Sequence, residues 1–94
     1  MHLNTLLFME KYDQLFLQLL YLMHHTAMQE LGKIANPVTG EVKRDLEKAQ
    51  QAIDMLEMLE EKTKGNISEE LDKTQSMMLS ELHINYAHEA NKES

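Results

Sequence analysis

The chain has 94 residues, enough for one domain, and its 16 acidic and 9 basic residues give a formal net charge of −7. Nucleic acids and anionic membrane surfaces attract basic proteins, so this charge balance disfavours both as partners. The absence of cysteine from the sequence excludes disulfides, zinc–thiolate sites, iron–sulfur clusters and thiol catalysis.

The most hydrophobic stretch of the sequence is LFLQLLYLM, residues 15–23. It is too short to cross a bilayer, which needs about 20 apolar residues. It also does not resemble a signal peptide, because charged residues closely precede it and no small-residue cleavage site follows it. We therefore expect a cytoplasmic protein. Residues 1–11 are interpreted as an N-terminal extension, with Met9 as an alternative to Met1 for the start of the protein.

Glycine and proline divide the remaining chain into three segments. Gly32 and Gly65 each follow a helix-forming stretch, and both are typical of the left-handed position near a helix C-terminus. The sequence NPVTG, residues 36–40, is typical of a turn in which proline presets the backbone. This pattern predicts an all-α, three-helix bundle-like domain over residues 12–90, followed by a C-terminal tail at 91–94. Its helices are expected at about residues 12–31, 46–64 and 69–88.

The second and third predicted helices each carry one apolar face. In the second helix, apolar residues cover about half of the circumference, and Asp45 is a candidate N-cap. In the third helix, the apolar stripe is narrower and includes the polar Gln75, and Asn66 or Ser68 is the candidate N-cap. Both helices can therefore bury their apolar residues by packing one face against the rest of the bundle.

The first predicted helix differs, because apolar residues lie around most of its circumference. Such a helix must be covered on every face, and two neighbours from the same chain cannot enclose it completely. We therefore predict that a homo-oligomer, most simply a two-fold dimer, completes the bundle through this helix; a different protein or lipid is the alternative cover. The predicted interface residues are Phe16, Leu17, Leu20, Tyr21, Met23 and Met28.

Two histidines in the first helix raise the question of a metal site. His24 and His25 lie close to Met23 and Met28, and thioether and imidazole groups suit Cu(I). However, the sequence offers no matching pair on a second helix and no Glu-x-x-His motif of the kind that di-iron bundles use. We therefore interpret these residues as packing or interface residues, and we predict no metal site and no cofactor.

The sequence also lacks a recognisable catalytic arrangement. Glu57, Glu60 and Glu61 lie near lysines in the second helix, where a run of charges is typical of a solvated face, with Glu60 at the edge of the apolar arc. The serines of the third helix have no histidine at helical spacing to activate them, and no glycine-rich phosphate-binding loop occurs. We predict that the protein is not an enzyme.

The stretch EKTKGN, residues 61–66, is explained by a helix end, because its lysines complement the negative end of the helix dipole. The longer stretch NPVTGEVKRDLEKAQQAIDMLEMLEEKTKGNISEE, residues 36–70, resembles the bacterial family called domain of unknown function 1844. That family typically has a Pro-Val-Thr-Gly turn, an acidic-capped helix ending in EKTKGN, and a Ser- or Thr-Glu-Glu start to its last helix. The resemblance covers about residues 15–86, although LYLMHHTAM replaces the small residues usual in the first helix. It implies a small all-helical bacterial protein and assigns no activity.

These observations predict a self-associating module for protein–protein interaction, whose other surfaces, around NPVTGE and EKTKGN, contact an unidentified cytoplasmic protein. Two alternatives remain open at this point. The protein could carry a small molecule or a metal in a bundle interior lined by methionine and histidine. It could instead associate peripherally with a membrane through its first helix.

Overall fold

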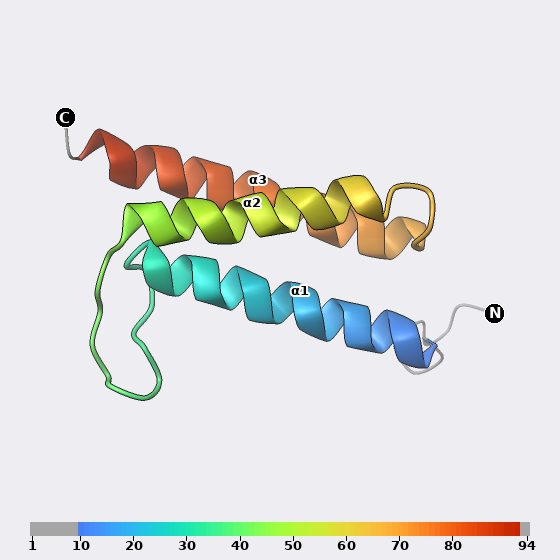
Figure 1. Ribbon diagram of the computed structural model, residues 1–94, viewed down its shortest axis with the longest axis horizontal. Coiled ribbons are helices and arrows are strands. Elements are labelled where there is room, and N and C mark those ends of the chain that lie inside the picture. The colour runs from blue at the N-terminus through green and yellow to red at the C-terminus, as the bar shows by residue number, and fades with distance from the viewer. Residues whose placement is uncertain (1–9, 93–94) are drawn as a thin grey trace.

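Three helices run along one another in the computed structural model, which describes residues 10–92 (Figure 1). They are α1 (Lys11–Glu30), α2 (Leu46–Lys62) and α3 (Glu69–Asn91). The described residues contain no strand, so the predicted all-α fold and the positions of its three helices are confirmed. The main difference is that α3 extends three residues past its expected end. The predictions for residues 1–9, including an alternative start at Met9, and for residues 93–94 lie outside the described part of the chain.

Side-chain caps start two of the three helices. An Oδ atom of Asp45 accepts a hydrogen bond from the backbone N–H of Lys48 at 3.1 Å, as predicted for the start of α2. At the start of α3, Ser68 Oγ accepts from the N–H of Leu71 at 3.1 Å, which decides between the two predicted caps. The alternative, Asn66, belongs to the preceding turn. These caps satisfy backbone donors that have no partner within the helix.

Glycines with positive φ lie where the chain leaves α1 and α2. Gly32 has a φ of 77°, and Gly65 has a φ of 79°, which confirms the predicted left-handed positions. After α1, the N–H of Gly32 bonds to the carbonyl of Gln29, and the N–H of Lys33 bonds to that of Met28. This pair of bonds is a Schellman motif, which satisfies the last carbonyls of the helix.

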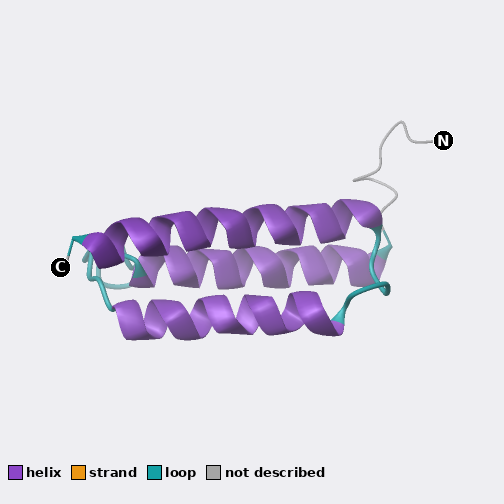
Figure 2. Cartoon of the chain, turned by 90° about the horizontal axis from the view of Figure 1, so that it is seen from above, coloured by secondary structure: helices purple, strands orange, loops and turns teal. Residues whose placement is uncertain are grey.

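The core lies along the line where the three helices meet, with α1 and α3 both packed on α2 and in contact with each other (Figure 2). Gln75 is also fully buried there, as expected for a polar residue within the stripe of α3, and its Nε2 donates to Thr63 Oγ1 at 3.4 Å. The apolar core residues are Leu20, Ala27, Leu31, Ala49, Ile53, Leu56, Met78, Leu79 and Leu82.

The segment 32–45 between α1 and α2 projects from one end of the bundle as a hydrogen-bonded loop (Figure 1). At its base, an antiparallel bridge joins Leu31 and Arg44. At its tip, Asn36 Oδ1 accepts from the N–H groups of Val38 and Thr39, at 2.8 and 3.2 Å. The backbone of Asn36 also bonds to Gly40 and Glu41. The loop is therefore held in one conformation by local bonds, and it leaves Val38 exposed.

Within residues 10–92, none of the helices is both long enough and apolar enough to cross a membrane.

Two glycines of the loop, Gly32 at its start and Gly40 at its tip, allow a matched test of the fold. Replacing either Gly32 or Gly40, which has a φ of 73°, with alanine forces a side chain into the left-handed region at a cost of about 1 kcal/mol. A Cβ at position 40 meets no atom within 4 Å, whereas a Cβ at position 32 lies 3.2 Å from Arg44 Cβ. We therefore expect Gly32→Ala to lower the free energy of unfolding more than Gly40→Ala does, measured by chemical denaturation. Equal losses would contradict close packing between Gly32 and Arg44.

Candidate interaction surface

The predicted interface residues of α1 occupy three different environments. Leu20 has no exposed surface and belongs to the core of the single chain, so it has nothing to offer a second copy. α2 and α3 cover that side of α1 in the single chain, and the homo-oligomeric interface itself stays a prediction. Tyr21 is exposed. The remaining four members are half-buried. Phe16, Met23 and Met28 pack against the core, and Leu17 does not belong to that group.

A different set of apolar residues forms the exposed side of α1. Tyr12, Leu15, Leu19 and Leu22 are 79%, 47%, 39% and 64% exposed, respectively. They are spaced three, four and three residues apart, so they lie along one side of the helix. Next to them on α2 are two more exposed residues, Met55 and Met58. We call these six residues the α1/α2 stripe.

A groove between the two helices connects both halves of the α1/α2 stripe. It has a volume of about 390 Å³, and Leu22 of α1 and Met55 of α2 both line it. α1 and α2 run in opposite directions. One turn from the groove toward the start of α1 lies Leu19, and one turn in the same direction along α2 lies Met58. Leu22 and Met55 therefore bring the two halves of the stripe together at this groove, which Thr26, Glu30, Lys48 and Gln51 also line.

A second groove lies between α1 and α3, and it contains one of the histidines considered for metal binding. Its lining includes Tyr21, Met77 and His24, and His24 Nε2 lies 2.7 Å from an Oε atom of Glu81. Across residues 10–92, no group of three or more His, Cys, Asp or Glu side chains is placed to hold a metal ion. In this structure His24 therefore links α1 to α3.

Further polar pairs join α2 to α3. His83 Nε2 lies 3.1 Å from an Oε atom of Glu57, and Ser76 Oγ donates to Glu60 at 2.7 Å. Glu57 is exposed and Glu60 is half-buried, in line with the positions expected from the helical pattern. The sequence pattern did not predict these pairs, because the partners lie on different helices and their contact depends on how the helices pack.

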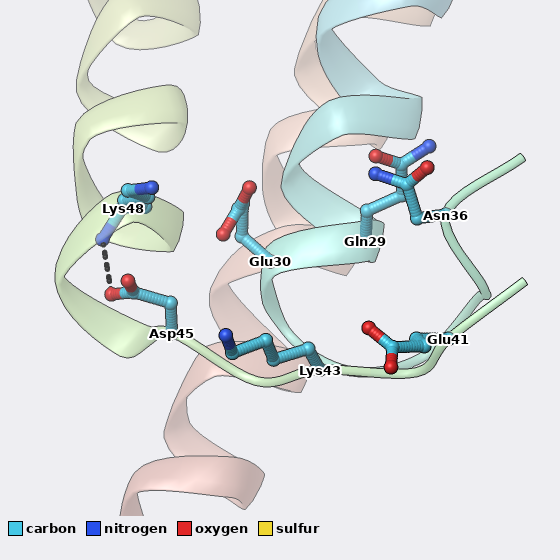
Figure 3. A pocket seen from close by; sticks show the side chains of 7 residues that line it. All are labelled: Gln29, Glu30, Asn36, Glu41, Lys43, Asp45 and Lys48. Atoms are coloured by element: carbon cyan, nitrogen blue, oxygen red, sulfur yellow. Dashed lines mark hydrogen bonds between the residues drawn. The ribbon is translucent and has the colours of Figure 1, made fainter. Parts of the chain in front are cut away.

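A polar hollow lies where the projecting loop meets the ends of α1 and α2 (Figure 3). Its volume is about 170 Å³, which is below the roughly 300–1,000 Å³ of most small-molecule sites. In Figure 3 the Asp45 cap closes one side of the hollow. The size and the mixed charges favour a solvated junction over a ligand site. Its lining residues are Gln29, Glu30, Asn36, Glu41, Lys43, Asp45 and Lys48.

Among residues 10–92, the titratable group with a clear pKa shift is Glu89, near the end of α3, which was not among the predicted site residues. It is only 5% exposed, and three cations reach its carboxylate. Lys33 Nζ lies 2.7 Å away, and Lys92 Nζ and Arg44 Nη1 each lie 3.0 Å away. Hydrogen bonds from Lys33, Lys92 and Arg44 lower the pKa of Glu89 from 4.5 to about 2, against the opposing effect of desolvation.

Two of the three cations around Glu89 come from distant parts of the chain. Lys33 and Arg44 lie at the two ends of the projecting loop, and Arg44 Nη1 also donates to the backbone carbonyl of Glu89 at 3.2 Å. Glu89 therefore ties the loop between α1 and α2 to the end of α3. The helix dipole disfavours a glutamate in the last turn of a helix. This position of Glu89 was the one feature of the sequence that could have indicated cationic partners from other parts of the chain.

The geometry defines a small three-helix protein whose main surface feature is apolar. The family model described as Domain of unknown function (DUF1844) matches residues 14–88, and the chain belongs to this family. This match confirms the resemblance carried by residues 15–86. A comparison with curated proteins finds no match to this chain, and a comparison with solved structures also finds none.

The acid stability of the fold should depend on Glu89. Its pKa is lower in the folded state than in the unfolded state, so the carboxylate stabilises the fold fully above about pH 4.5 and loses this effect as the pH falls through about 2. We expect Glu89→Gln to lower the melting temperature at pH 7. The difference from the unmodified protein should shrink below pH 4.5 and vanish near pH 2.

The matched control for this prediction is Glu81→Gln, because Glu81 is also on α3 but is exposed and pairs with a single histidine. Thermal unfolding followed by circular dichroism between pH 2 and pH 7 measures both variants. We expect the Glu81 variant to lose less at pH 7. A loss for Glu89→Gln that stayed constant down to pH 2 would show that the side chain acts through its shape and not through its charge.

Proposed function

We propose that this protein is a non-catalytic, cytoplasmic bacterial module that associates with a second copy of itself through α1 and that presents its other surfaces to a protein partner. The observation that carries the proposal is the α1/α2 stripe. Its six residues are between 39% and 79% exposed, which leaves on the order of 500 Å² of apolar surface in water. This is toward the upper end of the range for the largest patch found on typical monomers, about 300–600 Å².

The proposal uses a side of α1 next to the one predicted from the sequence. α2 and α3 cover the side with Leu20, and the side with Leu15, Leu19 and Leu22 is left uncovered by the described part of the chain. Two neighbours from the same chain do not enclose this side of the helix completely. Burying it contributes about 25 cal/mol per Å², part of which offsets the loss of freedom on association.

The structure does not favour the carrier alternative. That alternative needs methionine and histidine in the bundle interior. The buried core of the described residues is mainly leucine, isoleucine and alanine with Met78, and Met23 and Met28 pack at its edge. His25, His83 and His88 are exposed, and His24 pairs with Glu81 at a groove. We therefore retain the interaction module as the proposed function.

Light scattering tests the proposal. We expect the unmodified protein to have about twice its chain mass of 11.0 kDa. Leu22→Glu should return it to the monomer, because burying an unpaired carboxylate in the interface weakens association at least about tenfold, or 1.4 kcal/mol. Ile84→Glu is the matched control, since Ile84 is similarly exposed but lies on α3, outside the stripe.

Circular dichroism should show that both variants keep the helical content of the unmodified protein. A monomer of the unmodified protein at micromolar concentrations would contradict the proposal. A dimer that Leu22→Glu leaves intact and Ile84→Glu disrupts would move the interface to α3.

A further inference from the structure

The exposed side of α1 has the spacing of a coiled-coil seam. Tyr12, Leu15, Leu19 and Leu22 follow a three-four-three pattern, which corresponds to alternating a and d positions of a heptad repeat. The side of α1 that faces the core has its own apolar residues, among them Phe16, Leu20 and Met23. α1 therefore carries two adjacent apolar sides, one used within the chain and one with the pattern that another helix recognises.

The seam is complementary to itself when two copies of α1 run in opposite directions. Tyr12 of one copy then lies opposite Leu22 of the other, and Leu15 lies opposite Leu19. Each a position faces a d position, and every seam residue has an apolar partner. The two α2 helices lie on the same side of this seam, so Met55 and Met58 extend it. Complete burial of both stripes would remove at most about 1,000 Å² of accessible surface, which is the minimum for a specific interface.

The distribution of charge favours this antiparallel direction over the parallel one. The bundle end formed by the start of α1, the end of α2 and the start of α3 carries seven acidic and four basic residues, within 10–13 and 60–73. The opposite end carries five of each, within 29–48 and 86–92. Parallel pairing would bring two acidic ends together. Antiparallel pairing places each acidic end beside the balanced end of the other copy, which avoids that repulsion.

From the heptad spacing, the apolar area and the charge distribution together, we infer that the partner on the α1/α2 stripe is α1 of a second copy in antiparallel orientation, with Tyr12, Leu15, Leu19 and Leu22 as the seam. This inference rests on the proposed self-association and adds its direction and register.

Cross-linking of single-cysteine variants tests the direction, because the natural sequence contains no cysteine to give a background. Lys11, Gln18 and His25 are exposed, and they are spaced seven residues apart along the border of the seam. In the antiparallel arrangement, Lys11 lies near His25 of the other copy, and Gln18 lies near its own equivalent. Two copies of Lys11 are then about 18 Å apart along the helix axis, and two copies of His25 are about 24 Å apart.

The experiment uses a short bis-maleimide cross-linker on Lys11→Cys, Gln18→Cys and His25→Cys. We expect Gln18→Cys to form a cross-linked dimer by itself. Lys11→Cys and His25→Cys should cross-link only with each other when they are co-expressed, one of them with a tag that separates the mixed dimer on a gel. Circular dichroism checks that each variant is folded.

The outcomes distinguish this inference from the proposed function. A dimer in light scattering in which Lys11→Cys and His25→Cys each cross-link with themselves would show a parallel seam and overturn the inference alone. A dimer that none of the three variants cross-links would place the interface away from α1 and would also overturn it. A monomer would overturn both proposals and leave the stripe to a different protein.

Discussion

The structure depends on one packing constraint, which is that α1 is apolar around more of its circumference than α2 and α3 together cover. Leu20 and Ala27 are fully buried against the other helices, whereas Leu15, Leu19 and Leu22 on the neighbouring side remain in water. A globular helix usually has one apolar stripe toward its core and a polar surface elsewhere. The single chain buries the second apolar side of α1 only in part, so it is the feature for which a partner is the simplest physical explanation.

Ionic contacts join the loop between α1 and α2 to the end of α3. The chain leaves α1 through a Schellman motif, makes a hydrogen-bonded loop, and returns to start α2 at the Asp45 cap. Lys33 and Arg44, at the two ends of that loop, both bind Glu89 of α3. A nearly buried carboxylate with three cationic partners is well satisfied, and breaking such a group of contacts leaves charges without partners. The loop is therefore anchored at its base, although its tip projects from the bundle.

The apolar α1/α2 stripe and the ionic contacts of Glu89 lie in different parts of the molecule. Association through the stripe would use the faces of α1 and α2, which leaves the projecting loop, the α3 surface with Ile84, and the turn after Gly65 available. The loop tip is ordered by bonds from Asn36 and exposes Val38, so a partner would meet a surface that is already formed. This arrangement is consistent with a module that has one surface for its own copy and others for a different protein.

The sequence by itself determined the helices and their ends, because these depend on residues close together in the chain. The positive φ at Gly32, Gly40 and Gly65 and the caps at Asp45 and Ser68 are local effects of this kind. The family membership likewise follows from the turn and helix-end motifs that lie along one stretch.

Only the tertiary structure decided which apolar side of α1 is covered and which ionic groups meet. The apolar periodicity placed Leu20 and Leu19 on different sides of the same helix. It could not predict which side would be buried, because burial depends on where α2 and α3 pack. Glu89 and Arg44 are 45 residues apart, and their contact exists only because the loop returns to the end of α3. A pattern along one helix contains no information about such a distance. The candidate surface therefore emerged from the packing, although every residue in it was visible in the sequence.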